Sequence, residues 1–432
     1  MTWPSTMKAL LAPLLCTLAL SGPAAALAQP VAASAPAAAG SAPAAGHARH
    51  KAPQLALGAA FAPDGALWVA ALNAQGQLFT QASTDDGRSW SAARVLPTGS
   101  DRIAADGENR PKIAFGPRGL VVITYTEPLA RPYTGQIRML RSEDGGASFS
   151  APFTVHADRQ VITHRFESVA FDSRGTLHTL WVDKRDLEAL EAAARAAAPE
   201  PAPAASGARR KRADSAYRGA AIYRNESSDG GKTFGPDIKL ADHSCECCRI
   251  ALAPAPDGSL AAMWRHVFAP NERDHGFALL GGPAQAEPVR ASFDRWALDA
   301  CPHHGPGLTP AAAGGYHAVW FGERAGDARV RYGQLAADGT PRGAVQALPD
   351  EQAEHASVHA VGAQLAVTWR SFDGQATRWR AWLSGDDGQH FSLRELGSTR
   401  GDNDHPLLLA RGGQIHALWR TQEGIRVERL LP

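Results

Sequence analysis

The sequence predicts an all-β protein folded as a β-propeller of four-stranded blades, and three observations lead to this prediction. A pair of apolar strands joined by a Gly-containing turn recurs seven times after residue 53, with a period of about 50 residues. An aromatic residue ends the second strand in six of these repeats, and a second turn motif, S-x-D-x-G-x-x-[WF], occurs in four of them. Short strands with turn signals at this period are typical of propeller blades, which bury their faces only against neighbouring blades.

The number of blades follows from comparing the first repeat with the last one. In the first repeat we expect the inner strand at Gln54–Leu57, followed by a turn at Pro63–Gly65. The aromatic residues that end the second strands are Tyr125, Trp181, Trp264, Trp320, Trp369 and Trp419. The last repeat, 405–432, has room for about three strands, so we favour seven blades over six. Closing the ring would then need a strand from the residues just before Gln54.

The second motif predicts a hairpin turn in which the Asp accepts backbone N–H groups, the Gly has a positive φ and the aromatic residue plugs the blade. It occurs at Ser83–Trp90, Ser142–Phe149, Ser227–Phe234 and Ser384–Phe391. These segments resemble the Asp boxes, or BNR repeats, of sialidase-like propellers, over roughly residues 54–432. The resemblance implies the sialidase type of fold, in which the boxes have a structural role.

Export is expected from the first residues. Lys8 precedes an apolar stretch, and Ala26-Leu27-Ala28 offers the small residues of a signal-peptidase site. We expect 1–28 to be a secretory signal, 29–52 an Ala/Pro-rich disordered tether, and 53–432 the propeller. No other segment approaches the about 20 apolar residues of a membrane span. The protein is therefore predicted to be periplasmic or extracellular, without a membrane span.

Residues 186–218 interrupt the third repeat. Leu187–Ala198 is Ala-rich and predicts a helix, and a Pro-rich stretch with the basic run Arg209–Arg212 follows. This composition is typical of a flexible surface insertion with solvated charges, an interpretation that we prefer to a lid or a docking arm.

The overall composition excludes several classes of partner. Lys and Arg number 44 against 43 Asp and Glu, so the net charge of +1 provides no electrostatic footprint for nucleic acid. The chain has no P-loop, no Rossmann glycine pattern and no H-E-x-x-H motif, and we expect no nucleotide cofactor. We expect a monomer that binds a metal ion or a small anionic ligand, with a periplasmic protein as a further partner.

Ligand-capable residues gather where the inner strands begin. In a propeller, the loops that lead into the inner strands and those that leave the second strands surround one mouth of the central channel. The four cysteines that follow the signal lie in two successive loops of this kind. They are Cys245, Cys247, Cys248 and Cys301. Because adjacent blades place these loops side by side, we expect the thiols to meet in one funnel.

The cysteine cluster has three interpretations. Thiolates with His303, His304 or His243 would suit a soft ion, copper or zinc, and the lack of carboxylates argues against calcium. In an exported protein the two loops could instead be joined by a disulfide from Cys301 to one partner. A redox or heavy-metal sensor is the third interpretation.

Histidines and arginines recur at equivalent positions around the same funnel. His164, His355 and His405 come just before inner strands, and their ring nitrogens either cap and pack or bind a ligand. Three arginines follow the Trp of a second strand directly, and either form ion pairs between blades or hold an anion. They are Arg265, Arg370 and Arg420.

The resemblance to sialidases implies a specific use for such arginines, since three arginines grip the substrate carboxylate in that family. Asn109-Arg110-Pro111 is a distant echo of the Arg-Ile-Pro signature of sialidases, and it makes Arg110 a candidate ligand-binding residue. No Tyr nucleophile and acid/base pair can be identified, so no catalytic residue is assigned.

Soft-metal binding in a non-catalytic role is the function that the sequence favours. An exo-sialidase type of glycoside hydrolase acting on anionic sugars is the first alternative, and a disulfide-locked scaffold for protein interactions is the second.

Overall fold

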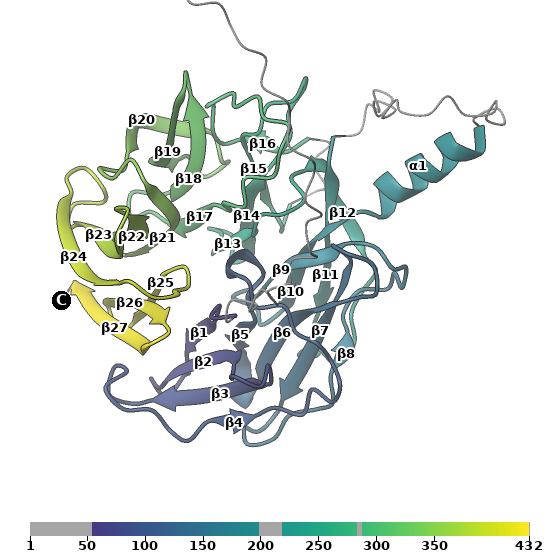
Figure 1. Ribbon diagram of the computed structural model, residues 1–432, viewed down its shortest axis with the longest axis horizontal. Coiled ribbons are helices and arrows are strands. Elements are labelled where there is room, and N and C mark those ends of the chain that lie inside the picture. The colour runs from purple at the N-terminus through teal and green to yellow at the C-terminus, as the bar shows by residue number, and fades with distance from the viewer. Residues whose placement is uncertain (1–53, 198–217, 283–286, 432) are drawn as a thin grey trace, which may run out of the picture. The chain divides into compact units, whose positions relative to one another are not determined.

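The computed structural model describes residues 54–197, 218–282 and 287–431 (Figure 1). The predicted signal, the tether and the basic part of the insertion lie outside these residues. The described chain forms seven antiparallel sheets in a ring, which confirms the prediction of a seven-bladed β-propeller. Within these residues, helix is confined to α1 (Arg185–Ala197) and to two 3-10 turns, η1 (Gly107–Asn109) and η2 (Pro117–Gly119).

In the described part of the chain, six blades have four strands and the seventh has three, and in every blade the chain runs in order from the inner strand outwards. The inner strands are β1 (Gly58–Phe61), β5 (Lys112–Phe115), β9 (His164–Phe171), β13 (Ala251–Pro254), β17 (Gly307–Pro310), β21 (Ala353–Val361) and β25 (Leu407–Arg411). The second strands are β2 (Leu67–Leu72), β6 (Val121–Pro128), β10 (Leu177–Asp183), β14 (Leu260–Arg265), β18 (Tyr316–Arg324), β22 (Gln364–Phe372) and β26 (Gln414–Thr421). The third strands are β3 (Leu78–Ser83), β7 (Gly135–Ser142), β11 (Ala220–Ser227), β15 (His275–Leu279), β19 (Asp327–Leu335), β23 (Thr377–Ser384) and β27 (Gly424–Leu431). The outer strands are β4 (Arg94–Val95), β8 (Phe153–Thr154), β12 (Ile238–Ser244), β16 (Val289–Arg290), β20 (Pro341–Ala347) and β24 (Ser392–Thr399).

The core lies between the blades. Each inner strand contacts the inner strands of both neighbouring blades, and these contacts close the ring. The second strands are the most deeply buried, because they are covered on both faces by adjacent sheets; Trp181, Trp369 and Trp419 on them are fully buried. Burial on both faces explains why these strands read as nearly continuous apolar runs in the sequence.

Side chains close the ring between the last blade and the first two. The carboxylate of Asp404, just before β25, accepts a hydrogen bond from the backbone N–H of Leu57 at 3.1 Å. It also accepts hydrogen bonds from Nη1 and Nη2 of Arg110 at 3.0 and 3.1 Å. Arg420 donates to the carbonyl oxygens of Leu55 and Leu72. The additional strand expected before Gln54 lies outside the described residues.

The four predicted hairpin turns have one common geometry. In each, the Ser hydroxyl accepts the N–H of the turn Gly at 2.7–3.0 Å, and the Asp carboxylate accepts the N–H four residues further on at 2.8–3.0 Å. The turn glycines have φ of 81–89°, and the aromatic residues pack against the blade cores. The sequence prediction of these turns is confirmed.

Two sets of predicted positions need correction. The first inner strand is not Gln54–Leu57 but β1, because the Leu57 N–H is taken up by the Asp404 carboxylate. His164 and His355 do not precede inner strands but lie inside β9 and β21. Each strand is irregular near its start, and His355 itself has a φ of +52°. A β-bulge changes the direction of a side chain without ending the strand, so a histidine inside the strand can still leave the regular pattern.

The insertion begins with the expected helix. α1 covers Arg185–Ala197, and Leu187 is its buried residue. No helix in the described part of the chain combines the length and the apolar character that a membrane crossing requires.

A Gly388→Ala substitution should lower the free energy of unfolding by about 2–4 kcal/mol, because a Cβ there would lie 2.0 Å from Tyr332 Oη of the preceding blade and the φ is +81°. Gly362→Ala is the matched control: its φ is also positive but nothing lies within 4 Å, so about 1 kcal/mol is expected. Urea unfolding measures both, and equal losses would contradict the tight turn-to-blade packing.

Asp404→Ala should destabilise the ring by about 3–5 kcal/mol, because it leaves the buried Arg110 guanidinium without its counter-charge. Glu428→Ala removes the partly exposed partner of Arg394 and should cost less than about 1 kcal/mol. Thermal and urea unfolding compare the two variants. A similar small loss in both would show that Asp404 does not hold the ring closed.

Candidate functional site

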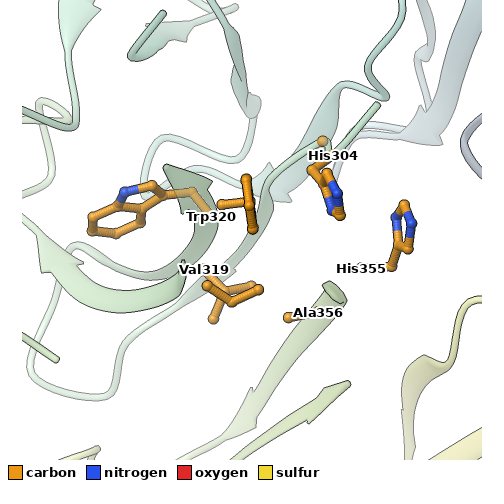
Figure 2. Close-up of a pocket in the computed structure, with 8 residues that line it drawn as sticks. His304, Val319, Trp320, His355 and Ala356 are labelled. Carbon is orange, nitrogen blue, oxygen red and sulfur yellow. The ribbon is translucent and has the colours of Figure 1, made fainter. Parts of the chain in front are cut away.

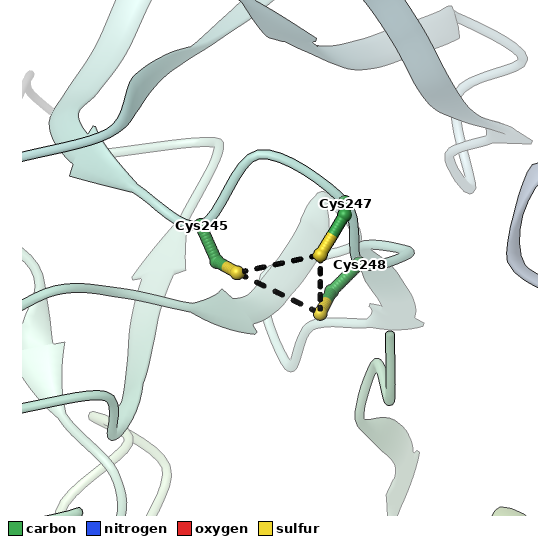
Figure 3. Close-up of side chains that lie close together, drawn as sticks. All are labelled: Cys245, Cys247 and Cys248. Atoms are coloured by element: carbon green, nitrogen blue, oxygen red, sulfur yellow. Dashed lines mark hydrogen bonds between the residues drawn. The ribbon is translucent and has the colours of Figure 1, made fainter. Parts of the chain in front are cut away.

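Three cysteines gather in the buried core between the third and fourth blades. Cys245, Cys247 and Cys248 lie between β12 and β13, and their Sγ atoms form a triangle with sides of 3.7, 3.9 and 3.9 Å (Figure 3). All three side chains are buried. These separations are well above the about 2.05 Å of a disulfide, and no disulfide joins any of the described cysteines. The disulfide interpretation therefore finds no support here.

Local backbone bonds produce this triangle. The N–H of Cys245 donates to the carbonyl of Arg265 at 2.9 Å, and Val267 N–H donates to the carbonyl of His243. The chain is thereby held against the end of β14 and turns back within four residues. The Sγ atoms of Cys245, Cys247 and Cys248 then face the same space.

Cys301, on the next loop around the ring, is not one of the three thiols that lie within 4.8 Å of one another. It is exposed, and its thiol interacts with the thiols of Cys245 and Cys247. Hydrogen bonds from the neighbouring thiols hold the pKa of Cys245 well below its ordinary value. A hydrogen bond with Cys245 raises the pKa of Cys247. A hydrogen bond with Cys245 also raises the pKa of Cys301, to about 11. These shifts favour the thiolate form at Cys245 over that at Cys247 or Cys301.

Two arginines place positive charge beside that thiolate. Arg273 Nη1 lies 3.5 Å from Cys245 Sγ, and the Arg265 guanidinium also favours the ionised form of Cys245. Arg265 donates to the carbonyl oxygens of His304 and Phe321 at 2.9 and 2.7 Å. It therefore fixes the loop that carries Cys301 while it stabilises the thiolate.

Glu108 is the central acceptor of the funnel. Its buried carboxylate receives two backbone N–H groups on Oε2, from Arg249 at 3.0 Å and Gly305 at 2.9 Å. Oε1 accepts from the Arg249 guanidinium at 2.5 Å and lies 3.2 Å from His355 Nδ1. Burial alone would raise the pKa of Glu108, but Arg249 and His355 bring it below its ordinary value. The carboxylate is therefore charged and ties three other blades to its own.

Three histidine rings stack beside Glu108. The ring centroids of His304 and His355 are 4.3 Å apart, and those of His355 and His405 are 3.3 Å apart, with nearly parallel planes. Burial is the main cause that lowers the pKa of all three rings, that of His304 to about 2. We call these rings the histidine column. They are uncharged at neutral pH, the state in which imidazole binds a metal.

A small crevice lies next to the histidine column. His304, Trp320 and His355 are among the residues that line it, and Figure 2 shows the His304 and His355 rings side by side. Phe321 stacks on His304 at 4.3 Å. The column is thus buttressed by apolar groups of the fifth blade.

The remaining predicted residues lie elsewhere or have other partners. His164 is fully buried away from the column and stacks on His156 at 4.0 Å. His303 is exposed, with a φ of +56°. Arg110 forms the ring-closing pair with Asp404. Arg370 pairs with Glu354 at 2.9 Å and donates to the Asn403 carbonyl.

The predicted arginine cluster is therefore bound to the protein itself. Arg265, Arg370 and Arg420 each donate to backbone carbonyl groups of other loops. The contacts are hydrogen bonds to the backbone, not the ion pairs between blades that were one of the two expectations.

Glu108 and Glu354 were not among the predicted site residues. Glu354 Oε2 lies 3.6 Å from His355 Nε2, opposite to Glu108. A usable signal was present, since Glu108 follows a glycine in a loop that leads into an inner strand. Gly107 has no room for a Cβ, which would lie 2.0 Å from the His405 ring, and a Cβ on Gly305 would lie 2.6 Å from Glu108 Oε2. Both glycines allow a close approach to the site.

Solved structures with a similar fold include carbohydrate-active enzymes. The polysaccharide lyase Uly1 aligns with a TM-score of 0.53 and 8% identity over 87% of this chain and 90% of its own. An ulvan lyase from a new polysaccharide lyase family gives 0.52 and 11% over 88% and 92%. A Hadza microbial sialidase gives 0.44 and 14% over 78% and 64%. At these identities the likeness shows the fold alone.

No family model matches the chain, and no curated protein matches it.

Limited alkylation of the reduced, metal-free protein should modify Cys301 first, because it is exposed while Cys245, Cys247 and Cys248 are buried. Peptide mass spectrometry after a short iodoacetamide treatment measures the order, and Cys301→Ser should remove the fast site. Equal rates at all four thiols in the folded protein would contradict this placement.

Proposed function

We propose that the protein binds one soft metal ion, copper(I) or zinc, on the thiol cluster of its funnel, in a binding or handling role. The sulfur triangle with sides of 3.7, 3.9 and 3.9 Å carries this proposal. Sulfur ligands at about 2.3 Å from an ion lie about 3.8 Å apart when the ion is tetrahedral and about 4.0 Å apart when it is trigonal. The three buried thiols have the spacing that such an ion requires.

The charges around the cluster suit a metal thiolate. A thiol releases its proton when it binds a metal, and the lowered pKa of Cys245 makes that release easier. Arg265 and Arg273 offset the negative charge of the thiolates. Soft thiolates without carboxylates select copper(I) or zinc over calcium or magnesium.

The fourth ligand distinguishes the two ions. A trigonal copper(I) ion needs only the three buried thiolates, whereas tetrahedral zinc takes four ligands. Cys301 completes the shell in our proposal, since its thiol interacts with Cys245 and Cys247. The imidazoles of His303 and His304 on the same loop are the alternative fourth ligands.

We further propose that the chain is exported by residues 1–28 and belongs with the sialidase-like propellers that carry BNR repeats. The Lys8-led apolar stretch supports export. The shared Ser and Asp hydrogen bonds of the four turns support an Asp-box origin. Disulfides form readily in exported proteins, and a bound metal would keep four adjacent thiols from oxidising.

A carbohydrate-active enzyme is the second candidate. The likeness to the two polysaccharide lyases favours it at the level of the fold. A sialidase-type reaction would need Arg265, Arg370 and Arg420 to hold an anionic sugar. Each would first have to leave the backbone carbonyl groups it now binds, such as that of Leu72 at 2.9 Å from Arg420. For this reason we place it after metal binding.

Metal titration of the anaerobically purified, reduced protein tests the proposal. A competition titration with a chromogenic chelator should find about one tight equivalent of copper(I) or zinc on the thiol cluster. Cys248→Ser should weaken this site by at least about 100-fold, because it removes one corner of the sulfur triangle. Cys301→Ser should weaken zinc more than copper(I), and His390→Ala on an exposed turn is the control that should change nothing.

The contrary outcomes are equally specific. A reduced protein that takes up neither ion at the cysteines would refute the proposal. If His303→Ala loses binding, the fourth ligand is the His303 imidazole and not the Cys301 thiolate. Turnover of a fluorogenic sialoside that is lost in Arg370→Ala would put the second candidate first.

A further inference from the structure

A second group of metal-ligating side chains lies in the funnel, apart from the thiols. It consists of Glu108, His355 and His405, all of them buried. One carboxylate oxygen and one ring nitrogen from each histidine lie within 4.8 Å of one another. The thiol cluster uses none of these residues, and they come from three different blades.

The donor atoms are spaced like the corners of a coordination polyhedron. Nδ1 of His355 lies 3.2 Å from Glu108 Oε1, and Nδ1 of His405 lies 3.6 Å from the same oxygen. Nitrogen and oxygen ligands at about 2.0–2.1 Å from a tetrahedral ion lie about 3.3–3.4 Å apart. Both edges fall within a few tenths of an ångström of this value.

His405 supplies an independent observation. Its Nδ1 is buried and has no hydrogen-bond partner among the described residues, and the residue as a whole is only 9% exposed. The ring is held by stacking on His355 and by close packing against Gly107. A buried polar atom without a partner costs stability, so it points to a missing ligand at that position.

The carboxylate is held in the orientation that a metal site needs. Two backbone N–H groups, of Arg249 and Gly305, fix Oε2, so Oε1 is turned towards the two rings. The Arg249 guanidinium also reaches Oε1, but it is anchored independently on the carbonyl oxygens of Pro306 and Ala356. It can release Oε1 and keep its place.

The backbone of His355 is held in an uncommon conformation for the same purpose. Its φ of +52° at the irregular start of β21 brings its Nδ1 to Glu108 and its Nε2 to within 3.6 Å of Glu354. Residues in the left-handed region concentrate at functional sites, because the surrounding structure must offset the strain.

We propose that Glu108, His355 and His405 form a second metal site, which binds a divalent ion of borderline softness, zinc or copper(II). One carboxylate and two uncharged imidazoles are the ligand set that such ions prefer, whereas thiolates suit copper(I). Binding requires the stacked rings to tilt apart, since a metal lies in the plane of each imidazole that it binds. The funnel then holds a sulfur site and a nitrogen-oxygen site linked through Arg249, which follows Cys248 directly.

Cobalt(II) titration of the full chain separates the two sites. Cobalt on the thiols gives intense sulfur-to-metal charge-transfer absorption, while cobalt on nitrogen and oxygen gives only weaker visible bands. We expect about two equivalents, one of each kind. His405→Gln should weaken the second equivalent by at least about 100-fold and leave the charge-transfer band intact. Cys248→Ser should do the reverse.

Controls keep the result interpretable. His390→Ala, which removes an exposed histidine, should leave both equivalents unchanged. His355→Gln gives a second test if His405→Gln unfolds, and circular dichroism with thermal unfolding checks each variant. The proposal is overturned if the folded histidine variants keep the weaker visible bands of cobalt bound to nitrogen and oxygen. It is also overturned if the protein binds only one equivalent of cobalt, the one with sulfur-to-metal charge-transfer absorption. Because the thiol band is read separately, failure of either site leaves the other visible.

Discussion

The buried carboxylate of Glu108 is the interaction on which the geometry of the funnel depends. A charge in a protein interior is tolerated only when its oxygens are fully bonded and its charge is balanced. The donors here come from Arg249, Gly305 and His355, which belong to three other blades. By bonding one carboxylate, the chain fixes the segment after Cys248, the loop after Cys301 and the start of β21. The group of three buried thiols and the group formed by Glu108, His355 and His405 are therefore connected by one network of hydrogen bonds.

Most of the fold could be predicted because its signals are local and repeated. Each S-x-D-x-G-x-x-[WF] turn satisfies its own hydrogen bonds, as Ser384, Asp386 and Gly388 illustrate, so sequence alone identifies it. The limits of the inner strands were less accessible. β1 starts after Leu57 because Asp404 binds that N–H from 347 positions away, and no local pattern carries this information. The short last blade was foreseen from its length, but the side chains that join it to the first blade were not.

The site was predicted in part. Propeller topology alone brings the Cys245–Cys248 segment and Cys301 to neighbouring loops, and His355 and His405 to the same funnel. It could not show that His164 stacks on His156 instead, or that Arg265, Arg370 and Arg420 bind backbone carbonyl groups. Those choices depend on which acceptor lies within about 3 Å of a flexible side chain, a matter of three-dimensional packing. Glu108 had a local signal, the glycine before it, but its partners Arg249, Gly305 and His355 come from three other blades and could not be read from the sequence.

The two groups of side chains depend differently on closure of the ring, because their members are spaced differently along the chain. The sulfur atoms of Cys245, Cys247 and Cys248 lie within four consecutive residues, so a nascent, still open polypeptide already carries them together. The histidine column depends on the docking of the last blade, where Asp404, the neighbour of His405, meets Arg110 across 294 positions. A chain truncated before that blade would keep the three thiols together and would lack His405, so Glu108, His355 and His405 come together only once the ring is closed.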